Sequence, residues 1–143
     1  MVKYRRGAGF LLAVLGRRAE ASWASFLRDR AVTTAEFTAM AVLAEGAASQ
    51  RAVAEGMGID PRNAGATIRR LVDRGWVESA PVADDRRAKR LSMTDSGSRW
   101  WTGLSAELAG ARSGFFDALS DRELCELERL LRKLEAGVSA PPR

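Results

Sequence analysis

Apolar side chains recur at helical spacing in three long stretches of the chain. From about residue 7 to 30 they form a stripe too wide for a lone surface helix, which indicates that other helices cover it. Two later stretches, at about 95–117 and 121–137, carry seams of apolar residues three and four positions apart, as in helices that pack along their length. The seams consist of Trp101, Leu104, Leu108, Ala111 and Phe115, and of Leu124, Leu127, Leu131, Leu134 and Val138.

Capping residues mark where several of these helices begin. Thr33 with Glu36 has the spacing of a capping box and predicts a helix at about 34–44. Ser120 with Glu123 repeats that spacing before the last helix, and Thr94 has the position of a cap for the helix at 95–117.

Two short helices are predicted in the middle of the chain. Ser49 can cap the first, at about 50–56, and Gly58 ends it. Asp60 then has the position of an N-cap and Pro61 that of a first helical residue, so a second helix runs to about Arg74. Two short helices joined by a glycine-containing turn are typical of a helix-turn-helix, whose second helix reads DNA.

The second of these helices has two chemically different faces. On a helical wheel its apolar face is expected to be core, and its polar face is free to enter a major groove, where Arg holds guanine edges and Asn holds adenine edges. The predicted core face is Ala64, Ile68, Leu71 and Val72. The predicted outer face is Arg62, Asn63, Ala66, Arg69, Arg70 and Asp73.

Gly65 stands inside this helix, where glycine costs about 1 kcal/mol relative to alanine. It has two interpretations of equal weight. Together with Ala66 it allows close approach to a phosphate or a thymine methyl group, or it is simply tolerated by the packing.

The pattern changes from helical to extended after Gly75. Residues 76–79 precede Pro81, and Leu91 with Met93 share a face on a return segment, which predicts a hairpin. Its tip is expected at Asp84-Asp85-Arg86-Arg87, flanked by Lys89 and Arg90. An arginine on such a tip can enter a narrow minor groove, with Asp85 holding an arginine in position.

Composition supports a binding protein more than an enzyme. Residues 62–90 carry eight basic and four acidic side chains, so this short block holds +4 of the net charge of +5. Histidine is absent and cysteine occurs once, which excludes the usual zinc sites, disulfide frameworks and His-based catalysis. No phosphate-binding glycine loop is present either. We therefore expect no catalytic residue, no metal and no cofactor.

The length of 143 residues fits one domain. The longest apolar run, residues 8–15, is far below the roughly 20 residues of a membrane span, so a cytoplasmic protein without a membrane partner is expected. The seams of the terminal helices, with the stripe at 7–30, are expected to bury one another across a two-fold homodimer. A closed monomeric bundle is the alternative.

The order of elements resembles the MarR family of bacterial transcription regulators over nearly the whole chain. The specific stretches are 49–60 in the helix-turn-helix, 71–77 at the end of the recognition helix, and 85–94 with Gly97 after it. The run Asp85-Arg86-Arg87-Ala88-Lys89-Arg90 is the most diagnostic, and 116–134 is similar to the family's C-terminal dimerisation helix.

The resemblance implies a mainly α fold with a small β-hairpin wing. It places a winged helix-turn-helix at about 33–93, flanked by dimerisation helices at about 7–30 and 95–138. It also implies a homodimer that binds double-stranded DNA at an inverted-repeat operator and represses transcription until an effector or oxidation releases it. The residues expected to contact DNA are Ser49, Gln50, Arg51, Arg62, Asn63, Ala66, Arg69, Arg70, Asp85, Arg86, Arg87 and Lys89.

The effector is expected to be a small phenolic or lipophilic compound, as for many family members. Trp23, Phe37, Met40 and Trp100 are candidates to line its cleft, although aromatic residues at helical spacing are more often core. The branch that senses peroxides has a cysteine in its first helix, and this chain has none there. Cys125 is instead expected to be a small buried side chain beside the apolar seam of the last helix.

A rival function is a winged-helix module that docks on an acidic protein surface without sequence-specific DNA binding. The basic hairpin is compatible with it. Arg62 and Asn63 at the start of the helix favour base edges instead, and a steep salt dependence of duplex binding would separate the two functions.

Overall fold

The computed structural model describes residues 7–110 and 114–138, without the side chains of residues 85–87. The chain divides into two compact units, Met1–Glu107 and Leu108–Arg143. None of the described helices is long and apolar enough to cross a membrane. The elements are α1 Ala8–Arg28, α2 Thr34–Ala44, β1 Ala48–Ser49, α3 Gln50–Met57, α4 Pro61–Asp73, β2 Val77–Val82, β3 Asp85–Met93, α5 Asp95–Gly110, the 3₁₀ turn η2 Gly114–Phe116 and α6 Asp121–Val138.

The predicted helix starts of the first unit are confirmed by their hydrogen bonds. The Thr33 hydroxyl accepts from the Glu36 N–H at 3.1 Å, and a Glu36 carboxylate oxygen accepts from the Thr33 N–H at 2.9 Å. Ser49 caps α3 by accepting from the Ala52 N–H, and Asp60 caps α4, which has Pro61 in its first turn. Each cap supplies an acceptor for an N–H that has no partner within the helix.

The wing is a three-stranded antiparallel sheet with the order β1-β3-β2. The hairpin of β2 and β3 was predicted, but β1 was not, because two residues are too few to show an alternating pattern. Pro81 lies within β2 rather than after it. Since β2 is an edge strand, the missing proline N–H leaves no unpaired partner on a neighbouring strand.

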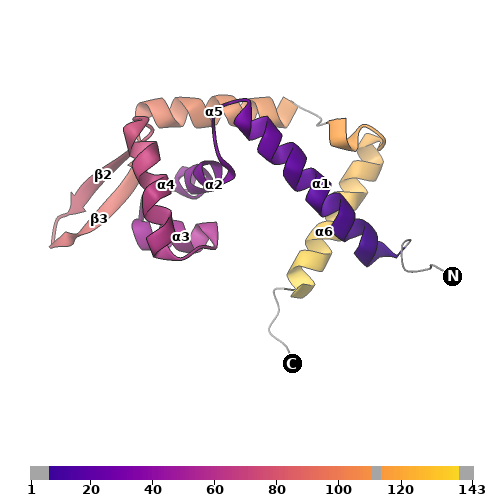
Figure 1. Ribbon diagram of the computed structural model, residues 1–143, viewed down its shortest axis with the longest axis horizontal. Helices are drawn as coiled ribbons and strands as arrows, with labels where there is room; N and C mark the ends of the chain where they lie inside the picture. The colour runs from indigo at the N-terminus through magenta and orange to yellow at the C-terminus, as the bar shows by residue number, and fades with distance from the viewer. Residues whose placement is uncertain (1–6, 111–113, 139–143) are drawn as a thin grey trace. The chain divides into compact units, whose positions relative to one another are not determined.

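The turn of the hairpin was placed too late in the sequence. Val82 pairs with Asp85, so the turn is formed by Ala83 and Asp84, and the backbone of Arg86 and Arg87 lies in β3. The pairing is irregular near the tip, because Pro81 pairs with Lys89 whereas the next residue, Val82, pairs with Asp85. In Figure 1 the hairpin projects away from α2, α3 and α4.

One apolar core holds the helix-turn-helix and the base of the wing together. It combines residues from α2, α3 and α4 with one residue each from β2 and β3. Each large aliphatic side chain buried here contributes about 1.5–3 kcal/mol to folding. Its members are Ala39, Met40, Leu43, Val53, Ala54, Ala64, Ile68, Leu71, Val77 and Leu91.

The core face of α4 differs from the predicted one at two positions. Val72 is 40% exposed and lines the flank of the helix beside the wing, whereas Thr67 is buried. Thr67 is accommodated because its hydroxyl accepts a hydrogen bond from Arg70 at 3.3 Å. The buried face of α4 is therefore turned slightly from the direction that apolarity alone indicates.

Residues at the end of the recognition helix and the start of α5 are joined through backbone contacts. The Trp76 carbonyl accepts from the Thr94 N–H at 3.0 Å, and the Thr94 hydroxyl caps α5 by accepting from the Gly97 N–H at 3.0 Å. A Cβ on Gly97 would lie 2.1 Å from the Trp76 carbonyl oxygen. Glycine is required there because the obstructing atom belongs to the backbone.

An ion pair connects the segment after α1 to α5. Both Arg30 nitrogens Nε and Nη2 donate to the Glu107 carboxylate, the first at 3.2 Å. The Arg30 guanidinium also lies 3.6 Å from the centre of the Phe26 ring. The hydrogen bonds from Arg30 lower the pKa of Glu107, so this pair is charged throughout the physiological range.

The helix predicted at 95–117 is not continuous. Instead, α5 ends at Gly110 and residues 114–116 form a 3₁₀ turn. Ala111 lies outside the described residues. The capping box of Ser120 and Glu123 is confirmed, and its hydrogen bonds from Ser120 lower the pKa of Glu123.

The apolar seam of α6 is open in the single chain. Leu131, Leu134 and Val138 are exposed, as is Leu130, and no residue of α6 is buried. Cys125 is exposed as well, so the expectation of a buried side chain is wrong for the single chain. Leu124 and Leu127, nearer the start of the seam, are partly buried.

Gly97→Ala should lower the free energy of unfolding by about 3 kcal/mol or more, since the new methyl group must displace the backbone at Trp76. Gly103→Ala is the matched control on the same helix, because nothing lies within 4 Å of its added Cβ. That control should be stabilising by up to about 1 kcal/mol through helix propensity. Urea unfolding of both variants gives the comparison, and equal midpoints would contradict the role of Gly97.

Candidate nucleic-acid interface

The outward face of α4 is polar, basic and free of apolar bulk. Arg62, Asn63, Ala66, Arg69 and Asp73 are all exposed. The Arg62 side chain is 93% exposed and its Nε lies 3.8 Å from the Asp60 carboxylate, so it is available beside the start of the helix. The opposite face is anchored by Ala64, Thr67, Ile68 and Leu71 in the core.

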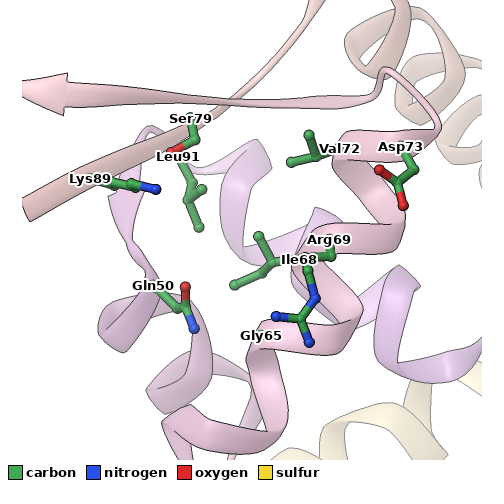
Figure 2. A pocket seen from close by; sticks show the side chains of 9 residues that line it. All are labelled: Gln50, Gly65, Ile68, Arg69, Val72, Asp73, Ser79, Lys89 and Leu91. Carbon is green, nitrogen blue, oxygen red and sulfur yellow. The ribbon is translucent and has the colours of Figure 1, made fainter.

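A groove of about 340 Å³ separates one flank of α4 from the wing. Figure 2 shows side chains from α3, α4 and both long strands around it. Two cationic side chains and one carboxylate lie among apolar and small neighbours, so the groove carries net positive charge. Its lining consists of Gln50, Gly65, Ile68, Arg69, Val72, Asp73, Ser79, Lys89 and Leu91.

Gln50 closes part of this groove over Gly65. A Cβ on Gly65 would lie 3.3 Å from the Gln50 Nε2, closer than most such contacts, but the neighbour is the end of a flexible, exposed side chain. Gly65 thus lets the amide of Gln50 lie close to the backbone of α4. This is a packing role, and it leaves the outward approach of a ligand to Gly65 untested.

The opposite flank of α4 is tied to α2 through a buried carboxylate. Glu36 is 1% exposed, and its Oε1 accepts from Arg70 Nε at 3.2 Å. Arg74 Nη2 lies 3.7 Å from the other oxygen, Oε2. The Glu36 side chain therefore serves both the capping box of α2 and the orientation of α4.

Arg74 links this cluster to the base of the wing. Its Nη2 donates to the carbonyl of Ala31, a residue held at φ 55°. The guanidinium lies 4.9 Å from the centre of the Trp76 ring, at the start of the segment that leads into β2. A positive φ is unfavourable for alanine, so the hydrogen bond to Arg74 helps to hold this strained turn.

Residues 32–88 match the model of the MarR family, and they comprise the helix-turn-helix and most of the wing. This part of the chain is therefore similar to the MarR family. The matched range contains the outward face of α4, the Glu36 cluster, and every core and groove residue except Lys89 and Leu91.

Solved structures of MarR proteins have the same fold. Apo wild-type MarR from E. coli is 20% identical with a TM-score of 0.78, covering 90% of this chain and 96% of that one. A mutant of that protein in complex with operator DNA is 22% identical with a TM-score of 0.70, covering 88% and 91%. BpsR from Bordetella bronchiseptica, whose DNA binding is regulated by 6-hydroxynicotinic acid, is 25% identical with a TM-score of 0.72, covering 89% and 97%.

Some of the residues predicted to contact DNA have free side chains, and others are engaged within the protein. Ser49 uses its hydroxyl to cap α3, and Arg51 pairs with Glu55 at 3.2 Å while staying 81% exposed. Arg70 points its Nε at Glu36. Lys89 is exposed at the groove, and the side chains of Asp85, Arg86 and Arg87 lie outside the described part of the chain.

The residues predicted to line an effector cleft make packing contacts within the single chain. Trp23 packs edge-on against Phe37 at 4.8 Å between ring centres, and Phe37 in turn lies 5.2 Å from Trp101. Trp100 stacks on Trp76 at 4.3 Å, and Met40 is fully buried in the core. All four make the packing contacts that were the alternative interpretation of their spacing.

Sequence reasoning missed the cluster around Glu36. Its capping role was visible because Thr33 is three residues away, but Arg70 is 34 residues distant and left no local signal. Arg74 was assigned only to the end of a helix. A buried charge needs partners, yet its burial is known only once the fold is known.

Gly65→Ala should raise the free energy of unfolding by about 0.5–1 kcal/mol, because helix propensity improves and Gln50 can move aside. Thermal unfolding beside the Gly103→Ala control measures this. If Gly65→Ala is destabilising while Gly103→Ala is not, Gln50 does not move aside and packing requires glycine at this position.

Proposed function

We propose that this protein is a sequence-specific DNA-binding transcription regulator of the MarR family. The observation that supports this most is the outward face of α4, where Arg62, Asn63 and Arg69 are exposed on a helix whose opposite face is locked into the core. A rigid helix with free Arg and Asn side chains in its first turns fits the major groove.

The contacts divide into base readout and phosphate attraction. Arg62 and Asn63, at the start of α4, are the proposed base-reading pair, with Ala66 beside them for close approach. Arg51, Arg69 and Lys89 are proposed to neutralise phosphates, aided by Ser49 and Gln50 at the start of α3. Arg86 and Arg87 of the wing, with Asp85 holding an arginine, are proposed for the minor groove.

The protein is proposed to act as a homodimer on an inverted-repeat operator. The exposed apolar side chains Leu130, Leu131 and Leu134 of α6, together with Leu11 and Leu15 of α1, need cover that a second copy can supply. Residues 7–30 and 95–138 would then be the dimerisation helices, and 33–93 the DNA-binding lobe. Two recognition helices must lie about 34–36 Å apart to reach successive major grooves.

We further propose that the protein is a repressor released by a small-molecule effector. BpsR, whose DNA binding is regulated by 6-hydroxynicotinic acid, supports a small aromatic compound as the class. A phenolic or lipophilic effector would act by changing the spacing of the two lobes, because a shift of a few ångströms is enough to lose one half-site. The protein would work without catalysis and in the cytoplasm, where its operator lies.

Arg62→Ala should weaken binding to the operator by about 1–3 kcal/mol, and much less to a scrambled duplex, because it removes a base contact. Lys89→Ala should weaken both duplexes similarly and reduce the salt slope by about 1. Fluorescence anisotropy with DNA upstream of the protein's own gene, at two salt concentrations, measures both effects.

Arg28→Ala is the control for these variants, since it removes the same charge from the exposed last turn of α1. It should leave both affinities within twofold of the wild type. Equal binding of operator and scrambled duplex by the wild-type protein would count against sequence-specific regulation. In that case the basic surface would favour an acidic protein partner.

Leu131→Asp combined with Leu134→Asp should separate the dimer and weaken operator binding at least a hundredfold, because the two lobes no longer bind as one unit. Glu128→Asp, on the same helix, is a mild control that keeps the charge. Sedimentation and anisotropy on the same samples test the link. Operator affinity that survives dissociation of the dimer would refute it.

A further inference from the structure

One carboxylate lies beside two arginines, one near the end of α4 and one at its C-cap. Among the described side chains, Glu36 is the only buried charged group. It lies within ion-pair distance of Arg70 and Arg74, which are one helical turn apart on the same flank of α4. The basic charge of this helix is therefore divided between two environments.

Each guanidinium group has donors engaged inside the lobe, while the Arg70 side chain is 50% exposed and the Arg74 side chain 33% exposed. Arg70 donates to Glu36 and also, through Nη2, to the Thr67 hydroxyl at 3.3 Å. Arg74 donates to the Ala31 carbonyl and lies over the ring of Trp76. By contrast, the Arg69 side chain makes no hydrogen bond or ion pair with the described residues. Arg69 lines the groove beside the wing.

We propose that Glu36 is a positioning residue for DNA recognition: it withholds Arg70 and Arg74 from phosphates and fixes the rotation of α4 about its axis. This rests on the proposed DNA-binding function. It reassigns Arg70 from a predicted DNA contact to an internal ion pair. Arg62 and Arg69 are then the arginines that the outward face presents.

The consequence is a gain in specificity at the expense of total affinity. An arginine that is free beside the duplex attracts phosphates of any sequence and strengthens non-specific binding. Pairing with Glu36 cancels one positive charge and restricts the other side chain to the lobe. A fixed rotation of α4 also keeps the base-reading side chains aimed at the same base pairs in every complex.

Glu36→Gln tests this, because the amide oxygen can still accept from the Thr33 N–H while the ion pairs are lost. We expect the slope of log K against log salt to steepen by ~0.9 for each arginine released. The ratio of operator to scrambled-duplex affinity should fall about tenfold. Glu45→Gln is the matched control, since it removes the same charge at the exposed end of α2, and its slope should equal that of the wild type.

In an Arg70→Gln background, Glu36→Gln should steepen the slope by only about half as much. If Glu36→Gln and Glu45→Gln give the same slope, the proposal is overturned while DNA binding itself stands. If the wild-type protein binds no duplex at any salt concentration, both proposals fall together.

A measurement on the wild-type protein covers the case in which Glu36→Gln does not fold. In ¹⁵N-labelled protein the Nε–H resonance of Arg70 should stay in place when operator DNA is added, because its partner remains Glu36. The Arg69 resonance should move. Movement of the Arg70 resonance to the same degree would show that it meets the phosphates and would overturn the proposal.

Discussion

A buried carboxylate organises the helix-turn-helix of this protein. Moving an ionised carboxylate out of water costs several kcal/mol unless charge and hydrogen bonds replace the solvent. Glu36 receives both, from a backbone N–H of its own helix start and from two guanidinium groups of α4. Because the partners belong to different elements, satisfying the charge requires α2 and α4 to be correctly placed at the same time.

This requirement extends beyond the pair itself. Arg74 also holds the strained turn at Ala31 and contacts Trp76, and the carbonyl of Trp76 fixes the start of α5 through Thr94 and Gly97. The segment before α2, the end of α4 and the base of the wing thus share one chain of contacts. A change at Glu36 is expected to disturb all three, whereas a change on the outward face of α4 disturbs none of them.

Local signals in the sequence were enough to predict most of the fold. Thr33, Ser49, Asp60 and Ser120 cap helices through atoms two or three residues away, so spacing alone revealed them. The features that escaped prediction depend on distant contacts. The hydroxyl of the buried Thr67 is satisfied by Arg70, and Arg70 is paired with a residue 34 positions earlier. The two-residue strand β1 exists only because β3 pairs with it.

The candidate site was predicted less completely than the fold, for a related reason. A helical wheel separates core from solvent, but it does not distinguish a solvent-facing arginine from one that reaches a buried acid on a neighbouring helix. Arg62 and Arg69 were correctly placed on the exposed face, and Arg70 belongs to the flank. Exposed positions on α4 also differ from positions held by distant contacts in how well they tolerate substitution. Arg62, Asn63 and Ala66 are exposed, so substitutions there should cost little stability, while Glu36 and Gly97 are constrained by the fold itself.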